Sequence, residues 1–137
     1  MSYVLILGAT SDIARRLAEE YARRGYDLFL AARASEGLGD LAAGLSERHR
    51  VKVALMDFEV RNIAGHKALF HSLDPMPEGI VCLVGTLGRG PTPPEGLEEL
   101  TEVAEVNFLG PAALLEVAAE AFERRRSEEH TSELQSR

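Results

Sequence analysis

Short apolar runs alternate with stretches of helical periodicity along most of the chain. Each run ends at a glycine or a charged residue, as expected of strands that are buried on both faces of a parallel sheet. Between the runs, apolar residues recur every three or four positions, which predicts amphipathic helices. Strands are therefore expected at residues 3–7, 27–32, 51–56 and 80–84, and helices at residues 12–24, 38–48, 63–73 and 97–125.

The helical segments differ in which residues their patterns bring together. In the first, Ile13, Leu17 and Tyr21 follow each other at a spacing of four, with alanines beside them. The last is expected to be interrupted at residues 110–111, where glycine precedes proline. The third is expected to face the core through four apolar residues, Ile63, Leu69, Phe70 and Leu73. Three histidines without ligand spacing are expected to be solvated or on helix faces: His49, His66 and His71.

The regular alternation of strand and helix indicates an α/β fold with helices on both faces of a parallel sheet. Right-handed crossovers favour the strand order 3-2-1-4, which is a truncated doubly wound sheet of the Rossmann type. Ligands of such sheets bind beyond the carboxyl ends of the strands, where the strand order reverses. The sequence therefore predicts a site between the ends of the first and fourth strands.

Two loops of small residues fall at that site. Residues 8–14 (GATSDIA) leave the first strand and open the first helix, where backbone amides and the helix dipole suit a pyrophosphate. The alternative is an ordinary turn in which Asp12 caps the helix. Residues 85–88 (GTLG) follow the fourth strand and would form the other wall. The coincidence of both loops with the predicted switch point favours nucleotide binding.

The end of the second strand bears on which nucleotide binds. NAD sites usually place a carboxylate there to bind the ribose 2′-hydroxyl. This strand ends at Ala32 and is followed by Arg33, whose guanidinium matches a 2′-phosphate in charge and geometry. NADP is thus favoured over NAD, and the alternative is that Arg33 is a solvated loop residue.

Composition excludes several other classes of protein. The chain has 137 residues, of which 45% are hydrophobic, and a net charge of −7, so a basic nucleic-acid-binding face is not expected. The single cysteine, Cys82, excludes a disulfide framework or a cysteine-based zinc site. Membrane spans and a secretory leader are not expected either, and the cytoplasm is the expected location.

The chain resembles the N-terminal half of the short-chain dehydrogenase/reductase family, from residue 1 to about residue 125. The family motif Thr-Gly-x-x-x-Gly-x-Gly aligns with residues 7–14, where only Gly8 is kept. The resemblance implies a pyrophosphate site at Gly8, Ala9, Thr10, Ser11, Asp12 and Ile13. Asp12 stands where the family has a glycine, and its side chain is expected to turn toward backbone amides.

The resemblance also assigns roles further along the chain. It places Asp57 and Phe58 against adenine; the alternative for Asp57 is a turn residue at the end of a strand. It places Gly85, Thr86, Leu87 and Gly88 beside the nicotinamide-side ribose. Asn107 aligns with the catalytic asparagine, whose carbonyl holds a water of the proton relay. Because Pro111 has no N–H to donate to that carbonyl, the carbonyl is expected to be free; otherwise Asn107 is a polar spacer.

The remaining catalytic residues of the family are missing from the sequence. Its reductases use an upstream serine and a Tyr-x-x-x-Lys motif, and no tyrosine here has a lysine four positions later. Residues 126–136 (RSEEHTSELQS) resemble the translation of a common short-read sequencing adapter. Residues 1–125 are therefore expected to be part of an NAD(P)-binding domain, and residues 126–137 a non-native tail.

The resemblance implies a parent oxidoreductase that transfers a hydride between NADP(H) and a small carbonyl or alcohol substrate, and that forms homo-oligomers. The chain itself is expected to be inactive and to bind NADPH weakly or not at all. The alternative is a non-catalytic NAD(P) sensor or regulatory protein, which the loss of motif glycines favours. No metal site is expected.

Overall fold

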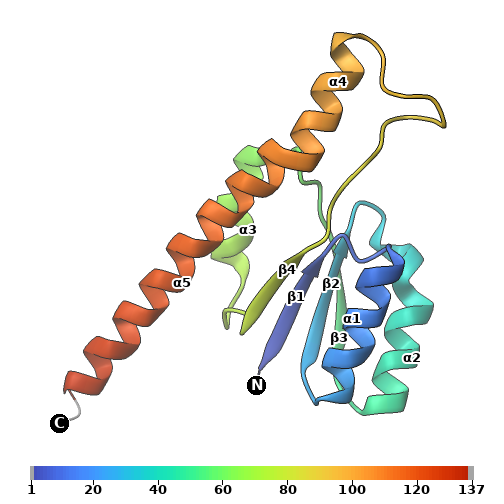
Figure 1. Ribbon diagram of the computed structural model, residues 1–137. Coiled ribbons are helices and arrows are strands. Elements are labelled where there is room, and N and C mark those ends of the chain that lie inside the picture. The colour runs from blue at the N-terminus through green and yellow to red at the C-terminus, as the bar shows by residue number, and fades with distance from the viewer. Residues whose placement is uncertain (1, 136–137) are drawn as a thin grey trace.

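A computed structural model of the chain describes residues 2–135, with side chains as far as residue 129 (Figure 1). The strands are β1 (Tyr3–Leu7), β2 (Asp27–Ala32), β3 (Val53–Asp57) and β4 (Gly79–Cys82). The helices are α1 (Asp12–Arg23), α2 (Gly39–His49), α3 (His66–Ser72), α4 (Gly96–Ala104) and α5 (Gly110–Gln135). Shorter turns are 3₁₀-helical at Ser35–Leu38 and Ile63–Gly65, and π-helical at Glu105–Leu109. Of the tail at residues 126–137, the last two residues lie outside the described part.

The sheet has the order β3-β2-β1-β4, and every pairing is parallel. This confirms the predicted α/β fold and its Rossmann-type strand order. Figure 1 shows α1 and α2 on one face of the sheet and α3 and α5 on the other, as right-handed crossovers require. The carboxyl ends of all four strands consequently meet at one edge of the sheet.

Alternate residues of β1 feed two separate apolar cores. Val4 and Ile6 pack on the face covered by α1 and α2, whereas Leu5 and Leu7 pack on the face covered by α3 and α5. Leu5, Ile6 and Leu7 are all fully buried. Since successive side chains of a strand point to opposite faces, a continuous apolar run is what a central strand needs.

The apolar residues of the helices are buried only in part as predicted. Phe70 and Leu73 are buried and Leu69 is partly buried, but Ile63 is 42% exposed because it belongs to a separate 3₁₀ turn. In α1 the buried residues are the alanines, and Ile13 is 64% exposed. The buried residues of α1 are Ala14, Ala18 and Ala22. Small side chains on this face let the helix pack closely on the sheet.

Several boundaries differ from the expected ones, among them the end of β4, which is Cys82 rather than residue 84. Strand β3 begins at Val53 rather than residue 51, because Arg50 ends α2 in the left-handed conformation (φ 55°) and the chain must turn before it pairs. The interruption of the last helix is a π turn in which the Gly110 amide donates to the Glu105 carbonyl. It precedes Pro111, which cannot donate a hydrogen bond within the helix.

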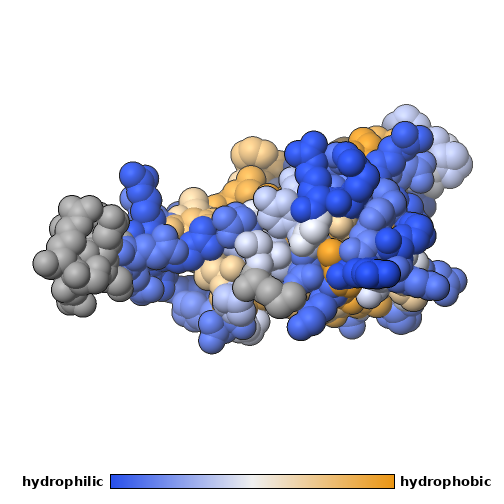
Figure 2. Space-filling model, turned by 90° about the horizontal axis from the view of Figure 1, so that it is seen from below, coloured by the Kyte–Doolittle hydropathy of each residue, from blue (hydrophilic) through white to orange (hydrophobic). Residues whose placement is uncertain are grey.

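Helix α5 packs on the sheet through its first half, where Leu114 and Ala118 are buried, and its C-terminal part extends away from the sheet (Figure 1) as far as Gln135. Arg125 joins it to the body by donating to the Pro77 carbonyl at 3.0 Å. Hydrophilic residues cover most of the face seen in Figure 2. No helix among residues 2–135 is both long and apolar enough to cross a membrane.

Candidate functional site

A cavity of about 850 Å³ lies at the carboxyl ends of the strands, where the topology predicts a ligand site. Its volume is in the range of cofactor sites. Loops that follow each of the four strands line it, together with one side of α4 and the π turn. Eight of the predicted site residues line it: Gly8, Thr10, Ser11, Arg33, Phe58, Gly85, Thr86 and Gly88.

The loop after β1 depends on the absence of a side chain at Gly8. This residue has a φ of +84°, and a Cβ there would lie 2.8 Å from the carbonyl carbon of Leu83. The amides of Gly8 and Ala9 donate to the Ala31 carbonyl at 2.9 and 3.1 Å, so neither is free for a ligand. Ala9 is buried in the core and does not line the cavity.

The first turn of α1 is capped by Ser11 and not by Asp12, so the alternative that made Asp12 the cap is wrong. Ser11 has an extended backbone, and its hydroxyl accepts a hydrogen bond from the Ala14 amide at 3.1 Å. Asp12 and Ile13 are the first residues of the helix, and their exposed side chains do not line the cavity. The helix can therefore present its N-terminal amides to an anion without a carboxylate in the way.

Arg33 lies at the rim of the cavity directly after β2. Its side chain is exposed, and it forms no ion pair among the described residues. Two positions later, the amide and hydroxyl of Ser35 both donate to Oδ1 of Asp57, at 3.1 and 2.7 Å. These hydrogen bonds, the hydroxyl first, lower the pKa of the Asp57 carboxyl.

Of the two residues assigned to adenine, one lines the cavity and the other does not. Phe58 lines the cavity, and its amide donates to the Ala32 carbonyl at 2.9 Å. Asp57 does not line the cavity, and its carboxylate faces Ser35 instead. Behind Phe58, the His66 ring stacks at 5.7 Å between centroids. His66 was expected to be solvated or on a helix face; it lies on α3 but is 1% exposed, so it is not solvated. Burial lowers the pKa of its imidazole.

The loop after β4 is held by Asn107. The Asn107 side chain accepts a hydrogen bond from the Thr86 amide at 2.7 Å and donates to the Thr86 carbonyl at 2.8 Å. Asn107 therefore holds the loop through its amide and does not itself line the cavity. Leu87 is 90% exposed and also lies outside the lining, because the loop turns its side chain to solvent.

Sequence reasoning missed a group of charged residues at the rim. Glu102 of α4 accepts from Arg61 at 3.1 Å and from Arg89 at 2.8 Å, and all three residues line the cavity. Arg89 also pairs with Glu98 at 3.2 Å. The hydrogen bonds that Arg89 donates to these carboxylates, to Glu102 first, raise the pKa of Arg89. Because these partners are 13 and 41 residues apart, only the fold brings them together.

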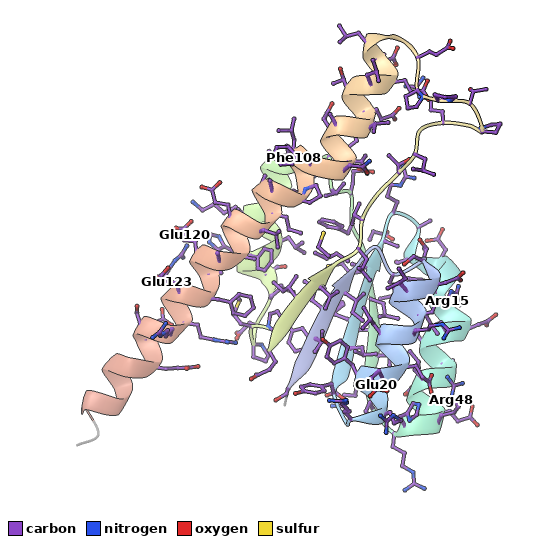
Figure 3. The ribbon with its side chains drawn as sticks, viewed as in Figure 1. Arg15, Glu20, Arg48, Phe108, Glu120 and Glu123 are labelled. Carbon is purple, nitrogen blue, oxygen red and sulfur yellow. The ribbon has the colours of Figure 1, made fainter. Side chains whose placement is uncertain are left out.

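Other side chains that the sequence did not single out complete the lining. They are apolar residues next to the strand ends, on α4 and on the π turn, with one further carboxylate: Ala32, Ala34, Glu59, Val60, Leu83, Val84, Val103 and Val106. Figure 3 shows Arg15, Glu20 and Arg48 on the outer side of α1 and α2, and Glu120 and Glu123 on the outer side of α5.

The parallel sheet and the cavity at its switch point define the chain as a Rossmann-type α/β domain. The family described as short chain dehydrogenase matches residues 2–129. The chain belongs to this family.

Similar proteins agree with that assignment. A putative steroid dehydrogenase 4 of Caenorhabditis elegans is 32% identical over 121 residues, which is 81% of this chain and 45% of that protein. Sulfoacetaldehyde reductase 2 of Chromohalobacter salexigens is 37% identical over 93 residues, 66% of this chain and 35% of that protein. A short-chain dehydrogenase from Sphingobium yanoikuyae, solved in complex with NADPH, superimposes with a TM-score of 0.78 at 26% identity. The superposition covers 91% of this chain and 50% of that dehydrogenase. The chain thus spans between about a third and a half of these proteins.

Proposed function

We propose that the chain is the nucleotide-binding N-terminal part of a short-chain dehydrogenase/reductase that transfers a hydride between NADP(H) and a carbonyl or alcohol. The observation that carries this proposal is the cavity at the switch point with Arg33 at its rim, where the guanidinium forms no ion pair with the side chains of residues 2–129. The NADPH bound to the similar Sphingobium yanoikuyae dehydrogenase supports it. When bound, NADP(H) supplies the hydride, and the protein supplies binding and orientation.

The lining residues suit the parts of such a cofactor. The N-terminal turn of α1, with Thr10 and Ser11 at the cavity, would hold the pyrophosphate. Arg33 would bind the 2′-phosphate, and Phe58 would contact the adenine. The loop of Gly85, Thr86 and Gly88 would lie along the nicotinamide-side ribose. NAD is the alternative cofactor.

The chain as it stands is proposed to be inactive. The sequence contains no Tyr-x-x-x-Lys motif to deliver a proton to a carbonyl oxygen. Asn107 is the one residue of the family's catalytic set that it carries, and its carbonyl is proposed to hold a water of the proton relay. Pro111, which has no N–H, supports this role.

Calorimetric titration with NADPH tests the proposed site. The sequence leaves weak binding or none as the expectation, and because the cavity is formed in this chain we now propose weak binding. We expect Arg33→Ala to weaken it about tenfold or more, since a charge-assisted contact to phosphate is lost. Arg48→Ala is the matched control, because Arg48 lies at the far end of α2 from the cavity (Figure 3). Equal binding by all three proteins would contradict the proposal, as would no binding by the unaltered chain.

A second candidate is a non-catalytic NAD(P) sensor or regulatory protein. It is favoured by the loop after β1, which keeps Gly8 but has Asp12 and Ala14 where the family motif has glycines. The continuation of the coding sequence distinguishes the two. A serine followed by Tyr-x-x-x-Lys supports the oxidoreductase, and their absence supports the sensor.

We further propose that residues 1–125 are part of the native domain and that residues 126–137 are a translated adapter. The identity of residues 126–136 with the adapter translation supports this. Resequencing the source nucleic acid tests it, and a genomic reading that continues through these codons would contradict it. For the parent protein we propose a cytoplasmic location, a small-molecule substrate and homo-oligomers, without nucleic-acid or membrane partners.

A further inference from the structure

Ser35 occupies an unusual position for a polar loop residue. It follows Arg33 by two positions, at the start of the 3₁₀ turn, and it is only 9% exposed. Its hydroxyl and amide both donate to the same carboxylate oxygen, Oδ1 of Asp57, at 2.7 and 3.1 Å. A buried serine with a charged acceptor is strongly constrained, since such hydrogen bonds are stronger than neutral ones.

These bonds join the ends of two neighbouring strands. Ala32 is the register partner of Asp57, and the Phe58 amide donates to the Ala32 carbonyl at 2.9 Å. Arg33 and Ala34 therefore leave β2 between two fixed points, the Ala32 carbonyl and the Ser35 side chain. Both residues line the cavity. The backbone that carries the Arg33 side chain is consequently held at the cavity rim.

The contact between Ser35 and Asp57 also holds the Asp57 carboxylate away from the ligand that Arg33 would bind. A carboxylate at the end of β2 or β3 would repel a phosphate dianion and would accept hydrogen bonds from a free ribose diol. Oδ1 of Asp57 is occupied by Ser35, and Asp57 does not line the cavity. Arg33 is thus the charged residue that lines the cavity directly after β2. Glu59 and Arg61 line it from the loop after β3, where the Glu59 carboxylate accepts a hydrogen bond from the Arg61 amide at 3.1 Å.

We propose that Ser35 is a positioning residue for cofactor choice: its contact with Asp57 holds Arg33 for a phosphate on the nucleotide ribose and keeps the carboxylate away from it. The inference rests on the proposed function, in which Arg33 binds the 2′-phosphate.

The test compares the affinities of the full chain for NADPH and NADH, by ligand-detected NMR at millimolar nucleotide. In Ser35→Ala we expect the NADPH-to-NADH affinity ratio to fall about fivefold to tenfold, with NADH affinity changed less than about twofold. Ser35→Thr keeps a hydroxyl and should restore most of the ratio. Ser72→Ala is the matched control, since the Ser72 hydroxyl donates only within α3, to the Leu69 carbonyl, and lies outside the cavity.

Two further measurements guard against a variant that loses its fold. Asp57→Asn keeps the shape of the acceptor but not its charge, and it should lower the ratio by a smaller factor of about three. A carboxyl-detected titration of the nucleotide-free chain should show the pKa of Asp57 moving up toward its ordinary value in Ser35→Ala.

The possible outcomes distinguish a failure of this inference from a failure of the proposed function. A ratio that stays within twofold while NADPH still binds would overturn the inference and leave the proposed function intact. Equal weakening of both nucleotides would also overturn it, because it would indicate a general structural role. No NADPH binding by the unaltered chain would overturn the proposed function and this inference with it.

Discussion

The cavity has a strand side, formed by the sheet and the loops at its carboxyl edge, and a helical side, formed by α4 and the π turn. The two sides differ in how much apolar surface they bury. On the strand side, Leu5, Ile6 and Leu30 are fully buried, and both faces of β1 are covered. On the helical side, α4 has no buried residue, and Leu97 and Leu100 are 82% and 52% exposed. Phe108, on the π turn that follows, is 68% exposed and visible at the outer surface (Figure 3).

Polar contacts take the place of apolar burial on the helical side. Helix α4 is tied to the loop after β3 by Arg61–Glu102, and to the loop after β4 by Arg89–Glu102 and Arg89–Glu98. Asn107 adds a paired hydrogen bond to Thr86. Exposed ion pairs are weak and are screened by salt, whereas buried apolar contacts are not. The stability of the strand side should thus respond to core mutations, and that of the helical side to salt and to single polar substitutions.

The largest expected effect is on the strand side. Leu5→Ala should lower the free energy of unfolding by about 2–5 kcal/mol, since it leaves a cavity between β1 and its covering helices. Leu115→Ala is the control, because Leu115 is 51% exposed, and it should change stability by less than about 0.5 kcal/mol. Urea unfolding measures both. Similar losses in the two variants would mean that the described burial does not determine stability.

Asn107→Ala should have the next largest effect, and a local one. It removes both hydrogen bonds to Thr86, a loss of about 1–2 kcal/mol, and frees the loop after β4. Amide hydrogen exchange at Thr86 should quicken while exchange in β1 is unchanged. Asn62→Ala, at an exposed position before α3, should leave both rates as they are. Faster exchange throughout the sheet would show that the two sides are not independent.

Acid should lower the stability of the strand side through His66, by a smaller amount than the substitutions above. Burial lowers the pKa of the folded His66 imidazole, so between the folded and unfolded pKa values the unfolded chain binds more protons. Stability should therefore be complete above the ordinary histidine pKa of about 6.5 and fall as the pH drops below it. His66→Leu should flatten urea-unfolding stability between about pH 7.5 and 5.5, whereas the exposed His71→Leu should not. An unchanged slope in His66→Leu would contradict this assignment.

Salt should have the smallest effect, confined to the helical side. Glu102→Gln breaks the bridge between Arg61 and Arg89 and should lower the melting temperature by no more than a few degrees at low salt. In 1 M salt the variant and the unaltered chain should melt alike, because the ion pairs are already screened. Glu116→Gln is the control, because Glu116 is an exposed residue of α5. A deficit in Glu102→Gln that persists at 1 M salt would point to a packing role for Glu102.

Much of this architecture can be predicted from residue order. The limits of β1 and β2, the parallel order of the sheet and the location of the site all follow from local patterns. Contiguous apolar residues can only be buried by a central strand, and the handedness of crossovers leaves few topologies. The positions of Gly8 and Arg33 at strand ends followed from the same reasoning, and both line the cavity.

Pairwise side-chain partners lie beyond that reasoning. The sequence alone determined that a doubly wound sheet forms and that its loops after β1 and β4 enclose a site. Only the tertiary structure decided that Ser35 binds Asp57, that Asn107 binds Thr86, and that Glu102 joins two arginines. The physical reason is that periodicity reports the average environment of a face, whereas a hydrogen bond depends on distances between residues far apart in the chain.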